Sequence, residues 1–226
     1  MGLRHTAGFR LFGIPQRALQ RSLSMKATLP TLIILGAGRG TRFHGGGHKL
    51  ARRMEGRSVF SHTLTRGLAS GLPLKVVTTE PLLPLVLPHV ARRDVVVLPD
   101  ARSQTQLGMG YSIAAGVRAA MDAPGWLVLP ADMPLVKADT LLGVARELRR
   151  HTVVYPQHEG RSGHPVGFSA ELASELVSLT GDEGARRVVA RYPAQALDVD
   201  DPGVLLDFDT EEDFQRWEGA GAAVPP

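Results

Sequence analysis

The residues with the clearest chemical potential follow an apolar stretch near the start of the chain. Between Leu32 and Leu50 the sequence LIILGAGRGTRFHGGGHKL contains six glycines, two arginines and a lysine. Glycines allow successive backbone N–H groups to turn inward on a small radius and form a nest for phosphate oxygens. Arg42 and Lys49 would add positive charge, so this stretch predicts a polyphosphate site. The residues expected to line it are Leu35, Gly36, Ala37, Gly38 and Gly40.

Two familiar phosphate loops do not fit this stretch, although GAGRG by itself also fits a tight turn between a strand and a helix. A Walker A loop requires Gly-Lys followed by Ser or Thr, whereas Lys49 lies between His48 and Leu50. The dinucleotide fingerprint G-x-G-x-x-G is absent, because Gly38 is followed by Arg-Gly-Thr. Its acidic ribose partner is poorly matched, since the first acid of the chain is Glu55. What remains is the pattern L-x-A-G-x-G-x-R followed by a lysine.

Acidic residues that could hold a metal ion lie in two segments. In WLVLPADMP, Asp132 directly follows an apolar run. A carboxylate is a hard oxygen ligand suited to Mg²⁺, which phosphoryl transfer uses to neutralise developing charge. The alternative is that Asp132 caps the following helix. In VDDPGVLLDFDTEEDFQRW, Asp207 and Asp209 are two residues apart on a strand-like segment and would point to one face, so that one or both complete the metal shell. We expect most other acids of this segment to be solvated or to favour a helix N-terminus.

Short apolar runs alternate with helical patterns along most of the chain. The runs are β-branched and apolar on both faces, as strands of a covered parallel sheet must be. The alternation predicts an α/β fold with a single doubly wound, mostly parallel sheet, in which ligands bind beyond the carboxyl ends of the strands. The insertion PQHEGRSGHPVGF at 156–168 has turn signals at Glu159–Gly160 and predicts a small hairpin or lid. The expected strands are 31–35, 74–79, 94–99, 126–130 and 152–156, and the expected helices are 59–70, 112–121, 138–150, 170–179 and 211–217.

The composition excludes several classes of protein. There is no cysteine, so disulfide frameworks, zinc–thiolate sites and cysteine nucleophiles are excluded. No apolar run reaches the ~20 residues that span a bilayer. Residues 1–28 hold five of the 26 basic residues and no acid, which leaves 21 basic against 22 acidic residues. Bulk charge therefore does not imply a nucleic-acid partner, and we expect a cytoplasmic protein with no nucleic-acid and no membrane partner.

Both ends of the chain are expected to lie outside the domain, which should span residues 29–218. The acid-free stretch 1–28 contains arginine and serine and resembles an organellar transit peptide. The alternative is that translation begins at Met25. The tail GAGAAVPP, residues 219–226, is small and helix-breaking, so we expect it to be flexible.

The glycine-rich loop resembles that of the nucleotidyltransferases that act on sugar phosphates and on the molybdenum cofactor. Their pattern LAAGxGxRxxxxK reads LGAGRGTRFHGGGHK here, with Gly36 where that family usually has alanine. Five further segments follow in the family's order: QLGMGYSIAAGV, PADMP, GHPVGF, LTGDEGARRVV and DFDTEED, the last with Glu211 in place of proline. Together they resemble the MobA/MocA-like molybdenum cofactor nucleotidyltransferases over about Leu32–Trp217. GDEGAR and VDDPGVLLDFDT favour the cytidylyltransferase branch.

This resemblance implies a Rossmann-like, GT-A-like fold and a Mg²⁺-dependent reaction. The terminal phosphate of molybdopterin would attack the α-phosphate of a nucleoside triphosphate, with CTP favoured and GTP possible, and pyrophosphate would leave. A molybdoenzyme or its chaperone is a possible further partner. The resemblance implies that Arg42, Lys49 and Asp132 are catalytic, with Arg42 and Lys49 on the β- and γ-phosphates. Asp132 would hold the metal together with Asp207 and Asp209. Gly108 and Gly110 would bind the nucleotide, and His164 and Arg186 would bind the acceptor.

Other functions stay open from the sequence. The same fold could transfer a nucleotide to a sugar phosphate or another small phosphate. The chain could also bind a nucleotide without turnover, although Arg42, Lys49 and Asp132 argue against it. His164 and Arg186 could be a surface histidine and an exposed helix arginine without a role. An RNA-binding role for the basic leader lacks an accompanying aromatic-rich strand.

Overall fold

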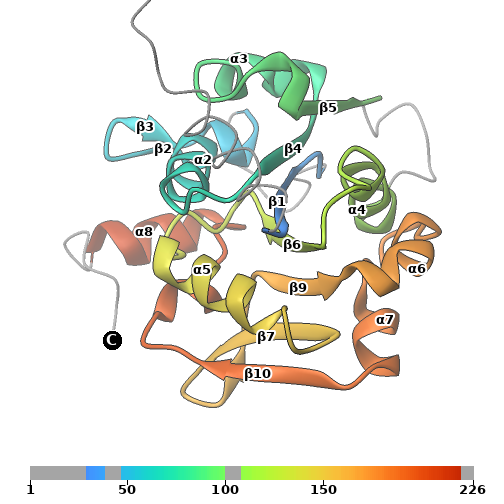
Figure 1. The fold of residues 1–226 in the computed structure, drawn as a ribbon. Coiled ribbons are helices and arrows are strands. Elements are labelled where there is room, and N and C mark those ends of the chain that lie inside the picture. Colours follow the sequence, from blue (N-terminus) through green and yellow to red (C-terminus); the bar gives the residue numbers. More distant parts are fainter. Residues whose placement is uncertain (1–28, 39–46, 100–107, 220–226) are drawn as a thin grey trace, which may run out of the picture.

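The computed structural model describes residues 29–38, 47–99 and 108–219, and at its centre lies an eight-stranded sheet. Seven strands lie in the order β10-β7-β9-β6-β1-β4-β5, and β8 pairs with β7 outside this row. β1 lies in the middle, parallel to β6 on one side and to β4 on the other (Figure 1). β2 and β3 form a separate hairpin. The strands are β1 Thr31–Gly36, β2 Arg53–Met54, β3 Arg57–Ser58, β4 Leu74–Thr79, β5 Val95–Leu98, β6 Gly125–Pro130, β7 Val153–His158, β8 Arg161–Ser162, β9 Val166–Ser169 and β10 Ala194–Asp198.

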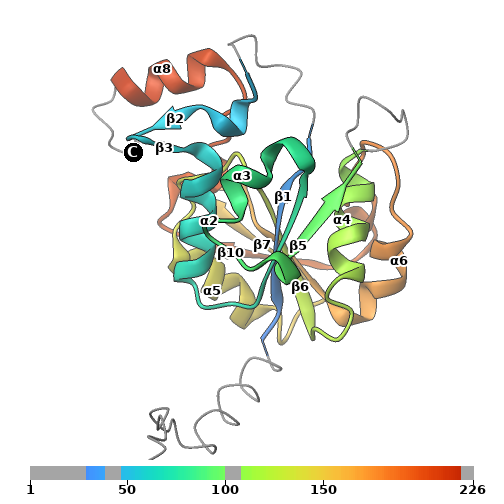
Figure 2. The same ribbon diagram turned by 90° about the horizontal axis from the view of Figure 1, so that it is seen from above.

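Helices cover both faces of the sheet, as a doubly wound fold requires. Figure 2 shows α2 and α5 on one side of the sheet and α4 and α6 on the other. Leu32 and Ile34 of β1 pack in the core with α2 and α5, whereas Ile33 packs in the core with α4 and α6. Because all three side chains are fully buried, β1 must be apolar on both faces. The α-helices are α2 Val59–Ala69, α3 Leu83–Val86, α4 Met109–Arg118, α5 Ala138–Glu147, α6 Ala173–Val177, α7 Arg186–Arg191 and α8 Glu211–Gly219, and the 3-10 helices include η1 Lys49–Ala51 and η5 Pro202–Leu205.

The predicted fold class is confirmed, and all five predicted strands are present. The sheet is mixed because β9, which the sequence did not predict as a strand, runs antiparallel between β6 and β7. The predicted hairpin is the β7–β8 pair, and its turn residues Glu159 and Gly160 have φ of 51° and 75°, as a two-residue hairpin turn requires. The chain then returns into the sheet as β9 and buries Phe168.

Other predictions differ in detail. The helix expected at 112–121 begins earlier, at Met109, and the one expected at 170–179 is a 3-10 turn followed by the short α6. The sequence did not predict α7 or the edge strand β10. The expected leader and most of the expected tail lie outside the described residues. Within the described ranges, no helix is long and apolar enough to cross a membrane.

Asp201 shows how the C-terminal segment is tied to the sheet. Its side chain is 1% exposed, although the sequence suggested a solvated acid. Its carboxylate accepts hydrogen bonds from the backbone N–H of Lys137 at 2.9 Å, from Thr140 Oγ1 at 2.6 Å and from the backbone N–H of Gly203 at 3.1 Å. Lys137 is the N-cap residue of α5 and makes no side-chain cap of its own. Asp201 therefore caps η5 through Gly203 and joins the start of α5 to the segment that leads to Asp209.

Asp201→Ala is expected to lower the free energy of unfolding by about 2–4 kcal/mol, because it leaves three donors without their charged acceptor. Denaturant unfolding followed by circular dichroism measures the change. Asp200→Ala removes the exposed neighbouring carboxylate and should stay within about 0.5 kcal/mol of the wild type. Equal losses in the two variants would contradict the capping role.

Candidate functional site

A cavity of about 740 Å³ opens at the carboxyl ends of β1 and β6. These ends are adjacent because Leu35 pairs with Pro130 and the backbone N–H of Ala131 donates to the carbonyl of Leu35 at 3.0 Å. The turn that follows β1 therefore faces the residue that follows β6. This is the edge of a parallel sheet at which ligands bind. Eleven of the residues predicted for the site line this cavity: Leu35, Gly36, Ala37, Gly38, Lys49, Gly108, Asp132, His164, Arg186, Asp207 and Asp209.

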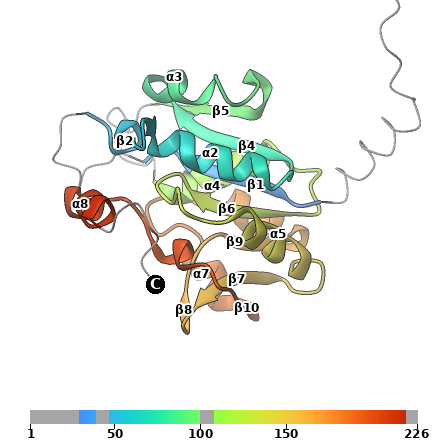
Figure 3. The ribbon, with the colours of Figure 1, turned by 90° about the vertical axis from the view of Figure 1, so that its left-hand side faces the viewer.

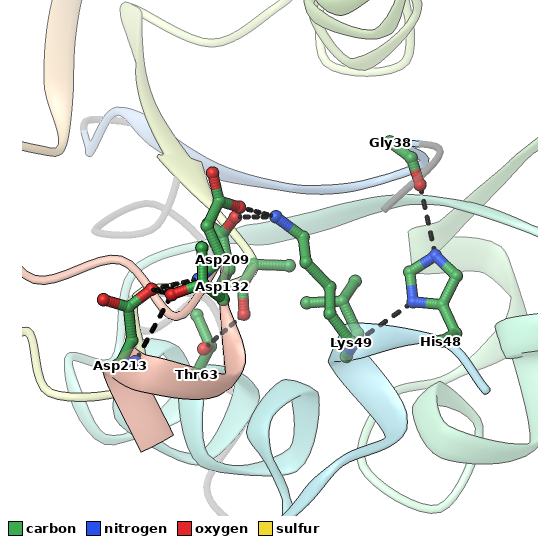
Figure 4. Close-up of polar contacts among 10 residues, drawn as sticks. Gly38, His48, Lys49, Thr63, Asp132, Asp209 and Asp213 are labelled. Atoms are coloured by element: carbon green, nitrogen blue, oxygen red, sulfur yellow. Dashed lines mark hydrogen bonds and ion pairs between the residues drawn. The ribbon is translucent and has the colours of Figure 1, made fainter. Parts of the chain in front are cut away.

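Lys49 lies between two carboxylates at the floor of this cavity (Figure 4). Its Nζ donates to Asp132 Oδ2 at 2.5 Å and also contacts Asp209 Oδ1. The three side chains are only 11–15% exposed. Burial by itself lowers the pKa of the Lys49 ammonium, but the charges and hydrogen bonds of Asp132 and Asp209 outweigh this effect and raise its pKa above the ordinary value. Lys49 is therefore a firmly charged ammonium that holds two carboxylates together.

His48 fixes the position of Lys49 relative to the glycine turn. Its Nδ1 accepts from the backbone N–H of Leu50 at 3.2 Å, and its Nε2 lies 3.1 Å from the carbonyl of Gly38. Because Nδ1 is an acceptor, the hydrogen on Nε2 can be donated to Gly38. The ring thus joins the end of the turn after β1 to the 3-10 helix η1, which carries Lys49 (Figure 4).

The backbone around Asp132 is fixed from two sides. The hydroxyl of Thr63 in α2 donates to the carbonyl of Ala131 at 2.7 Å, and the backbone N–H of Phe208 donates to the carbonyl of Asp132 at 2.9 Å. The second bond brings the C-terminal segment to the end of β6. It places Asp209 beside Asp132.

Asp213 and the aromatic residues of α8 hold the segment that presents Asp209. The Asp213 carboxylate accepts from the backbone N–H groups of Asp209 and Thr210, at 3.2 and 2.8 Å. Phe208 packs edge to face on Phe214 at 5.1 Å between ring centroids. Figure 3 shows α8 beside β2, and the salt bridge from Arg52, just before β2, to Glu211 of α8 is 2.7 Å long.

The segment 206–209 is not a strand, contrary to the prediction. Phe208 is buried and anchors this segment as a loop, so Asp209 is buried while Asp207 is exposed. Both side chains nevertheless line the cavity. Although the residue as a whole is exposed, partial desolvation of its carboxyl raises the pKa of Asp207, and the negative charges of Asp209 and Asp132 raise it further.

The donor set fits a divalent cation. Asp132 and Asp209 converge on one point, and Asp132 Oδ1 is buried without a hydrogen-bond partner in the described part of the chain. Hard carboxylate oxygens suit Mg²⁺ or Mn²⁺. Within the same ranges, no group of three or more His, Asp or Glu residues is arranged to hold a metal. A metal held here would need substrate oxygens or water as further ligands, as is usual for Mg²⁺ at phosphate-transfer sites.

Another part of the cavity wall comes from the β7–β8 hairpin, the residues just after it and the start of α7, which contribute Arg161, Ser162, His164 and Arg186. Burial lowers the pKa of His164, and the charge of Arg186 adds to this effect, while the charge of Asp132 opposes it. Its Nδ1 is buried without a hydrogen-bond partner among the described residues. His164 is therefore a neutral ring in the cavity wall near neutral pH.

Three predicted residues are not placed at the cavity. Arg42 and Gly40 lie outside the described residues. Gly110 does not line the cavity, because it is in the first turn of α4 and packs against the segment before α7. Its backbone N–H donates to the Gly181 carbonyl at 2.9 Å, and a Cβ on it would lie 2.7 Å from the carbonyl oxygen of Thr180. Glycine is thus required there for close packing.

Several cavity residues were not predicted from the sequence, among them Arg161, Met109 and Asp182. Arg161 directly follows the predicted hairpin turn. A hairpin inserted after a strand of the sheet extends beyond the carboxyl edge, and this signal could have identified Arg161 as a site residue.

The fold and the site together define a class of protein. It is an α/β protein with a glycine turn suited to phosphates at the carboxyl edge of the sheet, next to an acidic centre suited to phosphoryl or nucleotidyl transfer. The chain belongs to the family of MobA-like NTP transferase domains, which matches residues 32–196. It is therefore a nucleotidyltransferase of the MobA-like family, and the resemblance seen in the sequence is confirmed at this level.

Similarity to a known protein and to solved structures supports this assignment. The chain is 32% identical over 196 residues to the purine catabolism protein PucB of Bacillus subtilis (strain 168), covering 80% of this chain and 92% of PucB. The crystal structure of Rv0371c from Mycobacterium tuberculosis H37Rv is similar with a TM-score of 0.70 and 27% identity, covering 84% of this chain and 96% of that protein. A manganese complex of the same protein has a TM-score of 0.67 at 27% identity, over 84% of this chain and 97% of that one. At 18% identity and a TM-score of 0.61, the molybdopterin-guanine dinucleotide biosynthesis protein A of Archaeoglobus fulgidus shares the fold over 85% of this chain and 98% of that one.

Asp207→Asn is expected to raise the melting temperature of the metal-free protein near pH 7. The pKa of Asp207 is raised on folding, so the folded state binds this proton more tightly than the unfolded state and ionisation costs stability. This loss of stability is fully present above the pKa of Asp207 in the folded state, and it vanishes below the unfolded pKa of about 4. The higher melting temperature of Asp207→Asn should therefore disappear as the pH falls. Thermal melts in EDTA between about pH 3 and 8 measure this difference.

The matched control is Asp122→Asn, which changes an exposed carboxylate away from the cavity. It should shift the melting temperature little at any pH. A melting temperature of Asp207→Asn at or below the wild-type value near pH 7 would contradict the charge crowding described above.

Proposed function

We propose that this protein is a Mg²⁺-dependent nucleotidyltransferase that joins the nucleoside monophosphate of CTP to the terminal phosphate of molybdopterin and releases pyrophosphate. The observation that carries the proposal is the Lys49 ammonium held by Asp132 and Asp209 in the cavity that the glycine turn lines. A turn suited to phosphates, a lysine ammonium and two metal-compatible carboxylates are the groups that a triphosphate needs for displacement at its α-phosphate.

The reaction balances without a protein nucleophile. An oxygen of the acceptor phosphate forms a bond to the α-phosphorus, the bond from that phosphorus to the bridging oxygen of the β-phosphate breaks, and pyrophosphate leaves with the electron pair. A Mg²⁺ ion held by Asp132 and Asp209 would neutralise charge on the reacting phosphates. The turn Gly36–Gly38 would bind phosphate oxygens through its backbone N–H groups. Lys49, released from the carboxylates, would donate to the β- and γ-phosphates and stabilise the leaving pyrophosphate.

The choice of CTP is supported by the sequence of the glycine-rich loop. The loop begins LGAG and not the LAGG of the guanylyl branch, which favours the cytidylyl branch. Molybdopterin as acceptor, with delivery to a molybdoenzyme or its chaperone, follows from the same family resemblance.

Two alternatives have discriminating experiments. A nucleotidyltransferase for a sugar phosphate or another small phosphate would release pyrophosphate with that acceptor in a screen with CTP, GTP and UTP, and not with molybdopterin. A nucleotide-binding protein without turnover would bind the triphosphate and release no pyrophosphate with any acceptor.

Asp132→Asn is expected to lower kcat by about 10³-fold, because metal charge stabilisation supplies several kcal/mol at such a site. Pyrophosphate release from CTP with molybdopterin and Mg²⁺ is the measurement. Asp122→Asn is the control, since it replaces an exposed aspartate remote from the cavity, and it should retain the wild-type rate. Near-normal turnover of Asp132→Asn, with the protein folded, would remove Asp132 from the metal site.

The wild-type protein is expected to use CTP with a kcat/KM roughly 10- to 100-fold above that for GTP. A purine is too large for a pyrimidine pocket, and a base-edge hydrogen bond left unpaired adds about 1–3 kcal/mol against the wrong base. Both constants are measured with molybdopterin as acceptor. Equal values or a GTP preference would reject the cytidylyl assignment and leave nucleotidyl transfer in place.

A further inference from the structure

The positive charges of the cavity fall into two groups with different partners. Lys49, beside the glycine turn, is bound by Asp132 and Asp209. Arg161 and Arg186 line the other part of the cavity, and within the described ranges neither guanidinium has an ion pair or a side-chain hydrogen bond.

Arginines of α7 outside the cavity behave differently. Arg187 donates to Glu183 at 2.8 Å, and Arg191 pairs with Glu175 at 3.2 Å. Arg187 and Arg191, which do not line the cavity, are thus paired with acids. Arg186, which does line it, is available to a ligand. Asp182 and Asp207 also line the cavity, yet neither forms a salt bridge with Arg161 or Arg186.

The backbone that carries Arg161 is held firmly. Arg161 pairs with His158 across the two-residue turn of the β7–β8 hairpin. Two residues further on, Gly163 approaches the Val204 carbonyl so closely that a Cβ would lie 2.4 Å from its oxygen, and the backbone N–H of His164 donates to the same carbonyl at 3.0 Å. The hairpin is therefore fixed to the segment that leads to Asp207 and Asp209.

We propose that Arg161 and Arg186 together form the subsite for the phosphate of the acceptor, which is a phosphate monoester dianion. This inference rests on the proposed function. In an in-line displacement the attacking oxygen and the leaving pyrophosphate lie on opposite sides of the α-phosphorus. The glycine turn at the end of β1 and Lys49 would hold the pyrophosphate side. The hairpin that carries Arg161 extends from β7, and α7 leads into β10 beside β7, so both belong to strands on the other side of β6 from β1. The attacking phosphate would therefore enter from the side of Arg161 and Arg186. Each guanidinium can bind two phosphate oxygens, and a pair of them matches a dianion in charge and shape.

The test uses inorganic phosphate as the probe and the full chain saturated with Mg²⁺ and α,β-methylene-CTP. Isothermal titration measures phosphate affinity for the wild type, Arg161→Ala, Arg186→Ala and the control Arg187→Ala. We expect each cavity variant to bind phosphate at least 10-fold more weakly, with the affinity for the CTP analogue changed less than twofold, and Arg187→Ala to match the wild type. Arg161→Lys should recover only part of the loss, because a lysine cannot bind two oxygens in a fixed fork. Thermal melts check that each variant is folded.

Each outcome decides the matter. Phosphate affinity that is absent in the wild type, or unchanged in Arg161→Ala and Arg186→Ala, overturns the subsite. A loss of affinity for the CTP analogue instead assigns the arginines to the triphosphate and also overturns it. If the wild type binds no nucleotide but binds phosphate through both arginines, the proposed function fails while the anion subsite stands.

Discussion

The structure depends on one shared charge, the Lys49 ammonium between the carboxylates of Asp132 and Asp209. It joins three segments that are far apart in the sequence. Asp132, at the end of β6, is 83 residues from Lys49, and Asp209, in the C-terminal segment, is 160 residues from it. All three side chains are largely buried, so removing Lys49 would leave two carboxylates without a counter-charge in a poorly solvated place. The neighbouring contacts of His48, Thr63, Phe208 and Asp213 are explained by the need to hold this point in position.

The same arrangement links structure to chemistry. Two carboxylates held close together by a lysine are already in place for a divalent cation, so a metal can exchange for an ammonium with little rearrangement of the backbone. In the proposed reaction the ammonium would then be available to a triphosphate at the glycine turn. The sheet supplies the rigid part of this site, and loops and a hairpin supply the groups that contact ligand. This division is common when functional groups sit on loops held by a rigid scaffold.

The sequence predicted the central architecture because buried parallel strands such as Gly125–Pro130 are continuous apolar runs that no surface element imitates. It missed β9 because four residues that contain a glycine and follow a proline carry no periodic signal, and it missed β10 because an exposed edge strand is not apolar on both faces. Asp132 and Lys49 were predicted from their places after apolar or glycine-rich stretches. Their salt bridge, the buried cap of Asp201 and the exposed Arg161 on the cavity wall depend on contacts between distant segments, which periodicity does not reveal.

The measurement that tests nucleotidyl transfer most directly is the fate of label in CTP. The protein is incubated with Mg²⁺, molybdopterin and CTP labelled with ³²P at either the α- or the γ-phosphate. Our account predicts that the α-label appears in the acceptor product and the γ-label only in pyrophosphate. Transfer of the γ-label to the acceptor, or release of the γ-label as inorganic phosphate without an α-labelled product, would contradict it.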